Sequence, residues 1–259
     1  MTIIEKVSLR DSTSVTHGVK KYPVCLTIAG SDPSGGAGIE ADLKTFASHG
    51  VYGATCITGL TAQNTSRVAD IHKTPKEHLR KILELVFEDY LEPTGNAALK
   101  TIKTGMMTEE SLEVVYEFLD YLESHNIKVV VDPVLLSTSG YTLLAESLIQ
   151  AKSYSSFLLS AYLVTPNFIE ALSLLKVKSG TEVDDITSVE ELCDFTIKLQ
   201  KLIGCENILL KGGHIPWNSD GERAELNETV IDDLVVKDIL YQAKEDKITI
   251  YTSRYICTT

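Results

Sequence analysis

The segment VCLTIAGSDPSGGAGIEADLKTF (residues 24–46) contains the clearest structural pattern in this sequence. Its first part, residues 24–30, is an apolar run closed by glycine, which is typical of a β-strand buried on both faces. A glycine-rich loop follows. From Gly38 to His49 apolar side chains recur on one face of a predicted helix, and Gly50 provides a helix stop. A buried strand, a glycine loop and an amphipathic helix together indicate a unit of an α/β sheet.

The same alternation of strands and helices continues to about residue 214. The last segment, residues 230–256, differs because it reads as two antiparallel strands with a turn at 243–246. Alternating β and α units predict a single α/β domain on a mostly parallel sheet. Further strands are predicted at 52–60, 100–105, 128–134, 161–167 and 206–214, and further helices begin near Thr74, Thr108 and Ser188.

Composition excludes several classes of protein. The chain has 259 residues with 24 Lys+Arg and 36 Asp+Glu, a net charge of −12, which disfavours binding to nucleic acid or to an anionic membrane. Five dispersed cysteines form no zinc or disulfide pattern, and no stretch approaches the roughly 20 apolar residues of a membrane span. A cytoplasmic protein is expected, with residues 1–22 as a mobile N-terminal arm and residues 23–259 as the folded domain.

The glycine loop lies where open α/β sheets bind ligands, beyond the carboxyl end of a strand. A phosphate-binding P-loop is excluded because the required lysine and hydroxyl are absent, and the dinucleotide pattern is weak because no ribose-binding acid follows. Two readings remain at about even odds: loop amides that hold an anion, or a plain tight turn. Asp32 favours a ligand site, because its carboxylate can accept a hydrogen bond from a ligand hydroxyl.

Two neutral side chains follow the next strands. Gln63 carries a donor and an acceptor suited to an amino-substituted heterocycle, although a loop glutamine is more often simply solvated. Met106 suits the wall of a flat pocket, although a methionine there is more often part of the core.

Charged residues follow the later strands. Asp132 comes directly after three valines, a costly place for a carboxylate unless it binds a cation or a loop amide. Asn167 and Glu170 are three apart at a helix start; they are either an N-cap with its acid or, with Asp132, oxygen ligands around Mg²⁺. Lys211 ends a strand where it would meet a phosphate group.

Six motifs in order resemble the hydroxymethylpyrimidine and hydroxymethylpyrimidine-phosphate kinases of thiamine biosynthesis, within the ribokinase-like superfamily. The resemblance extends from about Pro23 to Thr259 and is closer to the fungal members than to the bacterial ones. The motifs are GSDPSGGAGIEADLKT (30–45), ITGLTAQNT (57–65), KTGMM (103–107), VDPV with STSG (131–140), TPN with EA (165–171) and KGGH (211–214).

This resemblance implies a three-layer αβα fold and two successive phosphoryl transfers from ATP, first to the hydroxymethyl group and then to its phosphate. It also implies ATP and Mg²⁺ as cofactors, a small pyrimidine as substrate and a homodimer. The residue roles that it implies are substrate binding by Asp32, Gly36, Gln63, Met106 and Val134, metal binding by Asp132 and Glu170, and nucleotide binding by Asn167, Lys211 and Gly213.

One departure from the family pattern concerns the end of the chain. In the family, a G-T-G-C segment with the anion hole and the residue nearest the reacting hydroxyl comes just after the position of Thr259, so no catalytic group is expected among residues 1–259. The chain is then expected to be an incomplete domain that binds the pyrimidine with little turnover. The alternatives are a naturally short pyrimidine-binding pseudoenzyme and a pyridoxal kinase.

Overall fold

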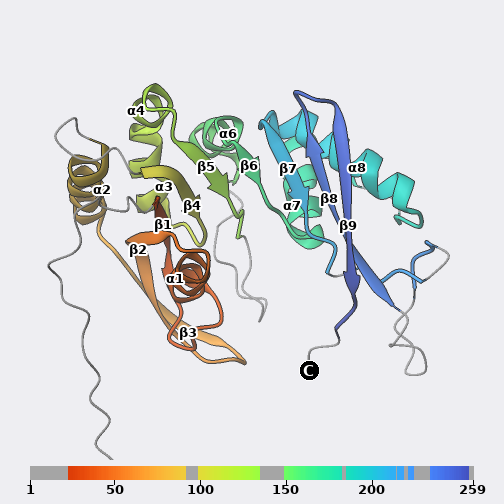
Figure 1. The fold of residues 1–259 in the computed structure, drawn as a ribbon, viewed down its shortest axis with the longest axis horizontal. Coiled ribbons are helices and arrows are strands. Elements are labelled where there is room, and N and C mark those ends of the chain that lie inside the picture. The colour runs from red at the N-terminus through yellow and green to blue at the C-terminus, as the bar shows by residue number, and fades with distance from the viewer. Residues whose placement is uncertain are drawn as a thin grey trace, which may run out of the picture.

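A computed structural model describes residues 23–91, 99–134, 149–182, 185–213, 215–218, 221–224 and 234–256. The N-terminal arm expected at 1–22, the STSG motif, His214 and the last three residues fall outside them. The described chain is a mixed α/β structure, as expected, and its elements alternate along one sheet (Figure 1). None of the helices in these ranges is long and apolar enough to cross a membrane.

The sheet contains nine strands in the order β3-β2-β1-β4-β5-β6-β7-β8-β9. From β2 to β7 all neighbouring strands run parallel, whereas β3, β8 and β9 are added antiparallel at the two edges. The mostly parallel sheet is thus confirmed. The strands are β1 (Val24–Ser31), β2 (Tyr52–Gln63), β3 (Val68–Lys73), β4 (Leu99–Thr104), β5 (Lys128–Val131), β6 (Leu163–Val164), β7 (Asn207–Leu210), β8 (Val235–Gln242) and β9 (Lys247–Arg254).

Helices lie on both faces of this sheet, so the three-layer arrangement is also confirmed. Helix α1 (Gly38–Ser48) packs on β1 and β2, in front of them in Figure 1. Thr27 of β1 points to that side, because its hydroxyl donates to Asp42 of α1. The alternate residues Leu26 and Ile28 join the main core with the other helices. These are α2 (Lys76–Leu91), α3 (Glu109–Glu117), α4 (Leu119–Ser124), α6 (Lys152–Leu159), α7 (Phe168–Ser179) and α8 (Val189–Ile203).

Helix α8 shows how local sequence sets an element's limits. Ser188 is its N-cap and forms a capping box with Glu191, and Gly204 follows its last turn in the left-handed conformation, with φ of 81°. The expected start and end of this helix are therefore confirmed. Near the C-terminus, a turn at residues 243–246 connects β8 and β9, also as expected.

The hairpin formed by β2 and β3 was not expected from the sequence. Gln63 is the last residue of β2 rather than a loop residue, and β3 pairs antiparallel with the end of β2. The reason is that β3 is an edge strand whose residues are exposed or half-buried, so it has no buried face to leave a clear apolar alternation. The hairpin extends the sheet beside the carboxyl ends of its parallel strands, where ligands are expected to bind (Figure 1).

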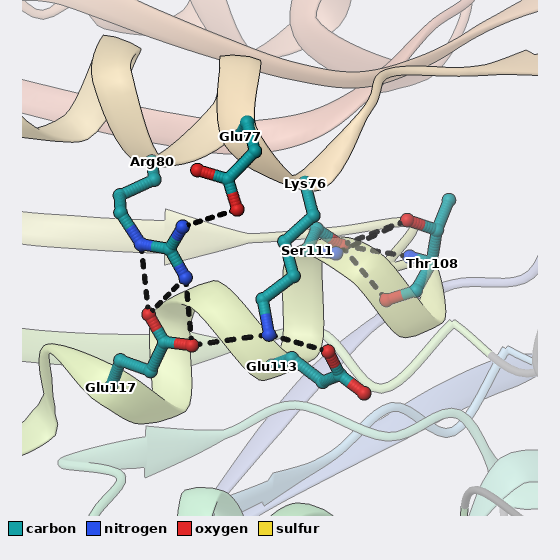
Figure 2. A network of polar contacts seen from close by, with 7 residues as sticks. All are labelled: Lys76, Glu77, Arg80, Thr108, Ser111, Glu113 and Glu117. Carbon is teal, nitrogen blue, oxygen red and sulfur yellow. Dashed lines mark hydrogen bonds and ion pairs between the residues drawn. The ribbon is translucent and has the colours of Figure 1, made fainter.

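A network of ion pairs joins α2 to α3 away from the ligand edge (Figure 2). Arg80 donates to both carboxylate oxygens of Glu117, with a shortest separation of 2.7 Å, and also to Glu77. Lys76 bridges Glu113 and Glu117, with nitrogen–oxygen distances of 2.7 and 3.1 Å. The network holds together the two helices whose apolar faces contribute to the core.

Candidate active site

The glycine loop after β1 is tied together by Asp32. Its buried carboxylate accepts hydrogen bonds from the backbone N–H groups of Ser34, Gly36 and Ala37 at 2.8, 3.1 and 2.8 Å, and from the Ser34 hydroxyl. The anion that these amides hold is therefore the protein's own aspartate. A carboxylate turned onto its own loop in this way is a familiar device for fixing a turn.

The charge state of Asp32 follows from this arrangement. Burial alone would raise the pKa of Asp32, but hydrogen bonds from Ser34 and Ala37, with a contribution from the Gln63 side chain, hold that pKa below its ordinary value. Asp32 is consequently a permanent negative charge at neutral pH that organises the loop.

Helix α1 holds the same loop from the other side. Glu40 accepts from the Ser31 hydroxyl at 2.6 Å and from the Asp32 N–H at 2.8 Å. Gly38 has φ of 60°, and a Cβ there would lie 2.4 Å from the Gly30 carbonyl oxygen. Only glycine allows the helix to begin so close to the strand that it follows.

A cavity of about 330 Å³ opens between this loop and the carboxyl ends of β1, β2, β4 and β5. This volume lies at the lower end of the range for small-molecule sites. Six of the residues predicted from the sequence meet at this cavity or in its wall loop. Asp32, Gln63, Met106, Asp132 and Val134 line it directly, whereas Gly36 contributes only through its bond to Asp32.

The two sides of the cavity have different characters. Met106 lies against Gly30, where a Cβ would come within 2.4 Å of the methionine methyl carbon, and the Thr58 hydroxyl donates to the Met106 carbonyl. Met107, by contrast, belongs to the core. Met106 and Val134 give the cavity apolar surface, and Gln63 adds an amide that can both donate and accept.

At the β5 side of the cavity, Asp132 pairs with a cation. Its Oδ1 lies 2.8 Å from Nζ of Lys211, which follows β7, so the ion pair passes across the end of β6. The hydroxyl of Thr165, after β6, also reaches Asp132 Oδ1 at 3.4 Å. This explains how a carboxylate can follow three valines: the sheet supplies its counter-charge from two strands away.

Asn167 and Glu170 form the capping box of α7. The Asn167 side chain accepts from the Glu170 N–H, and the Glu170 carboxylate accepts from the Asn167 N–H, both at 2.8 Å. The prediction that this pair is an N-cap with its acid is thus confirmed. It places the N-terminus of α7 beside Lys211, whose N–H donates to the Pro166 carbonyl.

The two glycines after Lys211 behave differently. A Cβ on Gly212 would lie 1.9 Å from the Lys237 carbonyl oxygen of β8, so this position requires glycine. Gly213, which was predicted to bind nucleotide, is exposed and has nothing within 4 Å of an added Cβ. Gly212 could not be predicted from the sequence, because the close approach of β8 has no local sequence pattern.

Two further residues of the cavity lining could not be predicted from the sequence. Lys103 of β4 and Asp42 of α1 line the cavity and pair at 3.1 Å. Tyr154 of α6 is a buried core residue outside the cavity lining. Burial raises the pKa of its hydroxyl, and the negative charges of Glu170 and Asp132 raise it further. A lysine in a central strand was the available signal for the first pair, because such a charge requires a partner.

The described residues on the β5–β7 side offer few ligands for Mg²⁺ from the protein itself. Among the described residues there is no group of three or more acidic, histidine or cysteine side chains placed to hold a metal. Asp132 Oδ2 nevertheless has no hydrogen-bond partner within those ranges, because Lys211 and Thr165 both donate to Oδ1. The Thr165 hydroxyl beside it is a further hard oxygen. Mg²⁺ is commonly held by one or two carboxylates together with substrate phosphates and water, so these residues fit it.

Comparison with known proteins shows the family of this chain. A family model described as phosphomethylpyrimidine kinase matches residues 32–259. The chain belongs to this family. A hydroxymethylpyrimidine/phosphomethylpyrimidine kinase of Saccharomyces cerevisiae is 37% identical over 242 residues, which are 93% of this chain and 39% of the yeast protein. The chain therefore spans about two fifths of the length of that relative.

Solved structures of family members and of other vitamin kinases share the fold. A phosphomethylpyrimidine kinase from Clostridium difficile is 35% identical, with a TM-score of 0.63 over 89% of this chain and 84% of that one. A Staphylococcus aureus pyridoxal kinase in complex with AMP-PCP and pyridoxal has a TM-score of 0.66 at 25% identity, over 92% of this chain and 73% of that one. The ribokinase-like architecture implied by the sequence motifs is thus confirmed.

Proposed function

We propose that this member of the phosphomethylpyrimidine kinase family binds hydroxymethylpyrimidine and transfers phosphate to it from ATP, first to the hydroxymethyl group and then to the monophosphate. The observation that carries the proposal is the cavity at the carboxyl edge of the sheet. It combines an amide side chain, apolar walls from Met106 and Val134, and an ion pair from Lys211 at the adjacent strand ends.

The residues divide into two groups along that edge. On the β1–β2 side, Gln63 would read the amino-substituted edge of the ring, while Met106 and Val134 would contact its faces. On the β5–β7 side, Asp132 and Glu170 would hold Mg²⁺, and Asn167, Lys211 and Gly213 would hold the nucleotide phosphates. Bound Mg²⁺ would supply charge neutralisation on those phosphates.

In the reaction, the substrate hydroxyl oxygen forms a bond to the γ-phosphorus while the bond from that phosphorus to the β,γ-bridging oxygen breaks. ADP leaves, and the hydroxyl proton is released. The chain's own residues would contribute position and charge: Lys211 balances the negative charge that gathers on the transferred group. No proton acceptor is assigned among the described residues.

We include a cytoplasmic location in the proposal, and the free thiols of the described residues are consistent with it. Four cysteines in the described ranges, Cys25, Cys56, Cys193 and Cys205, are free thiols. Burial raises the pKa of both Cys56 and Cys205 to about 12, so these two thiols stay protonated and unreactive. The proposal also includes a homodimer, which sedimentation analysis tests directly.

The test separates binding from transfer. Calorimetric titration of this chain with hydroxymethylpyrimidine, pyridoxal and ribose is expected to show the strongest binding for the pyrimidine. Mass spectrometry of the products formed by the protein with hydroxymethylpyrimidine, ATP and Mg²⁺ is expected to show addition of one phosphate and then a second. Stronger binding of pyridoxal would favour the pyridoxal kinase alternative, and binding of none of the three would overturn the proposal.

A further inference from the structure

Three aspartates line the cavity, and they differ in what their oxygens already bind. Both oxygens of Asp32 are taken by its own loop. Asp132 directs one oxygen to Lys211, on the side that the proposed function gives to the nucleotide. Asp42 remains, on the side of α1 and β4, and no part of the proposed reaction uses it.

Only one oxygen of Asp42 is occupied in the described part of the chain. Its Oδ2 accepts from the Thr27 hydroxyl at 2.6 Å and from Lys103 Nζ at 3.1 Å. Oδ1 has no hydrogen-bond partner among those residues. The side chain is only 16% exposed, so this free acceptor belongs to the cavity wall rather than to open solvent.

Lys103 is held in place as firmly as its partner. A Cβ on Gly105 would lie 2.9 Å from Lys103 Nζ and 3.1 Å from the Ala29 Cβ, so the lysine passes over the glycine toward the cavity. Its ammonium has three N–H groups, and Asp42 takes one of them. The remaining N–H groups of Lys103 are available to a ligand in the cavity that both residues line.

A desolvated ion pair is a costly element in a cavity wall, and its net charge is zero. A half-buried pair with one free acceptor and free donors is therefore suited to a neutral ligand that presents a donor and an acceptor near one another. An amino-substituted nitrogen heterocycle does so: its amino group donates, and its ring nitrogen accepts. An ionised hydroxyl or a carboxylate on the ring would be repelled by Asp42.

We propose that the Lys103–Asp42 pair is a second recognition element of this cavity, in which Asp42 Oδ1 accepts from the ligand's amino group and Lys103 donates to a ring nitrogen. Thr27 is a positioning residue that fixes the orientation of Asp42. The proposal rests on the proposed function, because it takes an aminopyrimidine as the ligand. It adds a determinant from α1 and β4 to the contact expected from Gln63.

The test combines a protein variant with a ligand variant. Asp42→Asn is titrated calorimetrically with hydroxymethylpyrimidine and with 5-hydroxymethyl-2-methylpyrimidine, which lacks the amino group. The variant should weaken binding of the first about tenfold and of the second less than twofold, because a hydrogen bond to a charged group contributes only where the donor is present. Glu182→Gln, in an exposed ion pair with Lys176, is the matched control and should change neither.

Two further variants guard against a purely structural effect. Lys103→Met should weaken both ligands about tenfold, because the ring nitrogen is common to them, and Lys103→Arg should restore part of the loss. Thr27→Val is close in size to the native residue and should weaken only the amino ligand, by a smaller factor. It tests the proposal even where Asp42→Asn fails to fold.

The outcomes distinguish failure of the role given to the Lys103–Asp42 pair from failure of the proposed function. Equal weakening of both ligands by Asp42→Asn and Thr27→Val, or no weakening of either, would overturn the role of the pair while the native chain still binds the pyrimidine. Failure of the native chain to bind hydroxymethylpyrimidine would overturn the proposed function, and the role of the pair with it.

Discussion

Lys211 and Asp132 form an ion pair of 2.8 Å that joins the ends of β7 and β5 across β6. Asp132 directly follows β5, and Lys211 directly follows β7. The pairing exists only because the parallel strand order brings the two ends together. It places a cation that can be shared with a ligand next to the cavity that holds Met106 and Gln63.

Replacing this lysine should separate nucleotide binding from pyrimidine binding. Lys211→Met removes the cation but retains much of the side-chain length, so affinity for the ATP analogue AMP-PCP with Mg²⁺ should fall at least about tenfold, as expected for loss of a charge-assisted contact. Affinity for hydroxymethylpyrimidine should change less than twofold. Calorimetric titration measures both.

The control is Lys201→Met, because Lys201 is exposed in the last turn of α8. It should leave both affinities unchanged. Equal loss of nucleotide affinity in the two variants would show that general charge, rather than the position of Lys211, is responsible.

Asp32 should contribute to stability in a pH-dependent way. Asp32→Asn exchanges a carboxylate that accepts several N–H bonds for an amide, and at pH 7 the free energy of unfolding should fall by about 2 kcal/mol. Because the pKa of Asp32 is lowered in the folded chain, its contribution is complete above the unfolded pKa and is lost as pH falls through the folded value. Urea unfolding at pH 7 and in acid should therefore show a difference between native and variant that shrinks below about pH 4.

Asp89→Asn, at an exposed position near the end of α2, is the comparison for this effect. It should show a difference near zero at both pH values. A constant destabilisation by Asp32→Asn across the pH range would contradict the role given to its ionised form.

The two glycines after Lys211 provide a matched pair for stability. Gly212→Ala should lower the free energy of unfolding by about 2 kcal/mol or more, because its Cβ would lie 1.9 Å from the Lys237 carbonyl oxygen and β8 would have to move. Gly213→Ala, next in the chain, should be close to neutral because its Cβ meets open space. Thermal melting compares the two, and similar melting temperatures would show that β8 is not held as closely as described.

The ion pairs between α2 and α3 (Figure 2) should contribute less to stability than the glycine at position 212, and their contribution should decrease as salt is added. Glu117 accepts from both Arg80 and Lys76, so Glu117→Gln breaks the centre of the network. The pairs are on the surface, where solvent screens them. The loss in melting temperature should be smaller than that of Gly212→Ala and should disappear near 1 M salt, whereas an effect independent of salt would point to packing instead.

The sequence was informative wherever an element has a buried face. The apolar run of β1 and the capping box of Ser188 and Glu191 could be identified from local pattern, because burial and capping constrain residue types directly. The rule that ligands bind beyond the carboxyl ends of parallel strands then gathered Gln63, Met106 and Asp132 into one cavity. The exposed strand β3 had no such constraint and could not be predicted.

Contacts made across elements were beyond the reach of local pattern. That Asp32 would occupy the amides of its own loop depends on the loop's three-dimensional path. The pairing of Lys103 with Asp42 depends on α1 packing on β1, the neighbour of β4 in the sheet, although the two residues are 61 positions apart. In both cases the residue types were visible in the sequence, whereas their partners were not.

The central claim is that the cavity beside Gln63 binds hydroxymethylpyrimidine, and calorimetric titration of the native chain and of Gln63→Ala tests it most directly. We expect one binding site per chain in the native protein and a loss of affinity of about tenfold or more in Gln63→Ala, which should still fold cooperatively. Absence of binding to the native chain, or equal affinity for the two proteins, would contradict it.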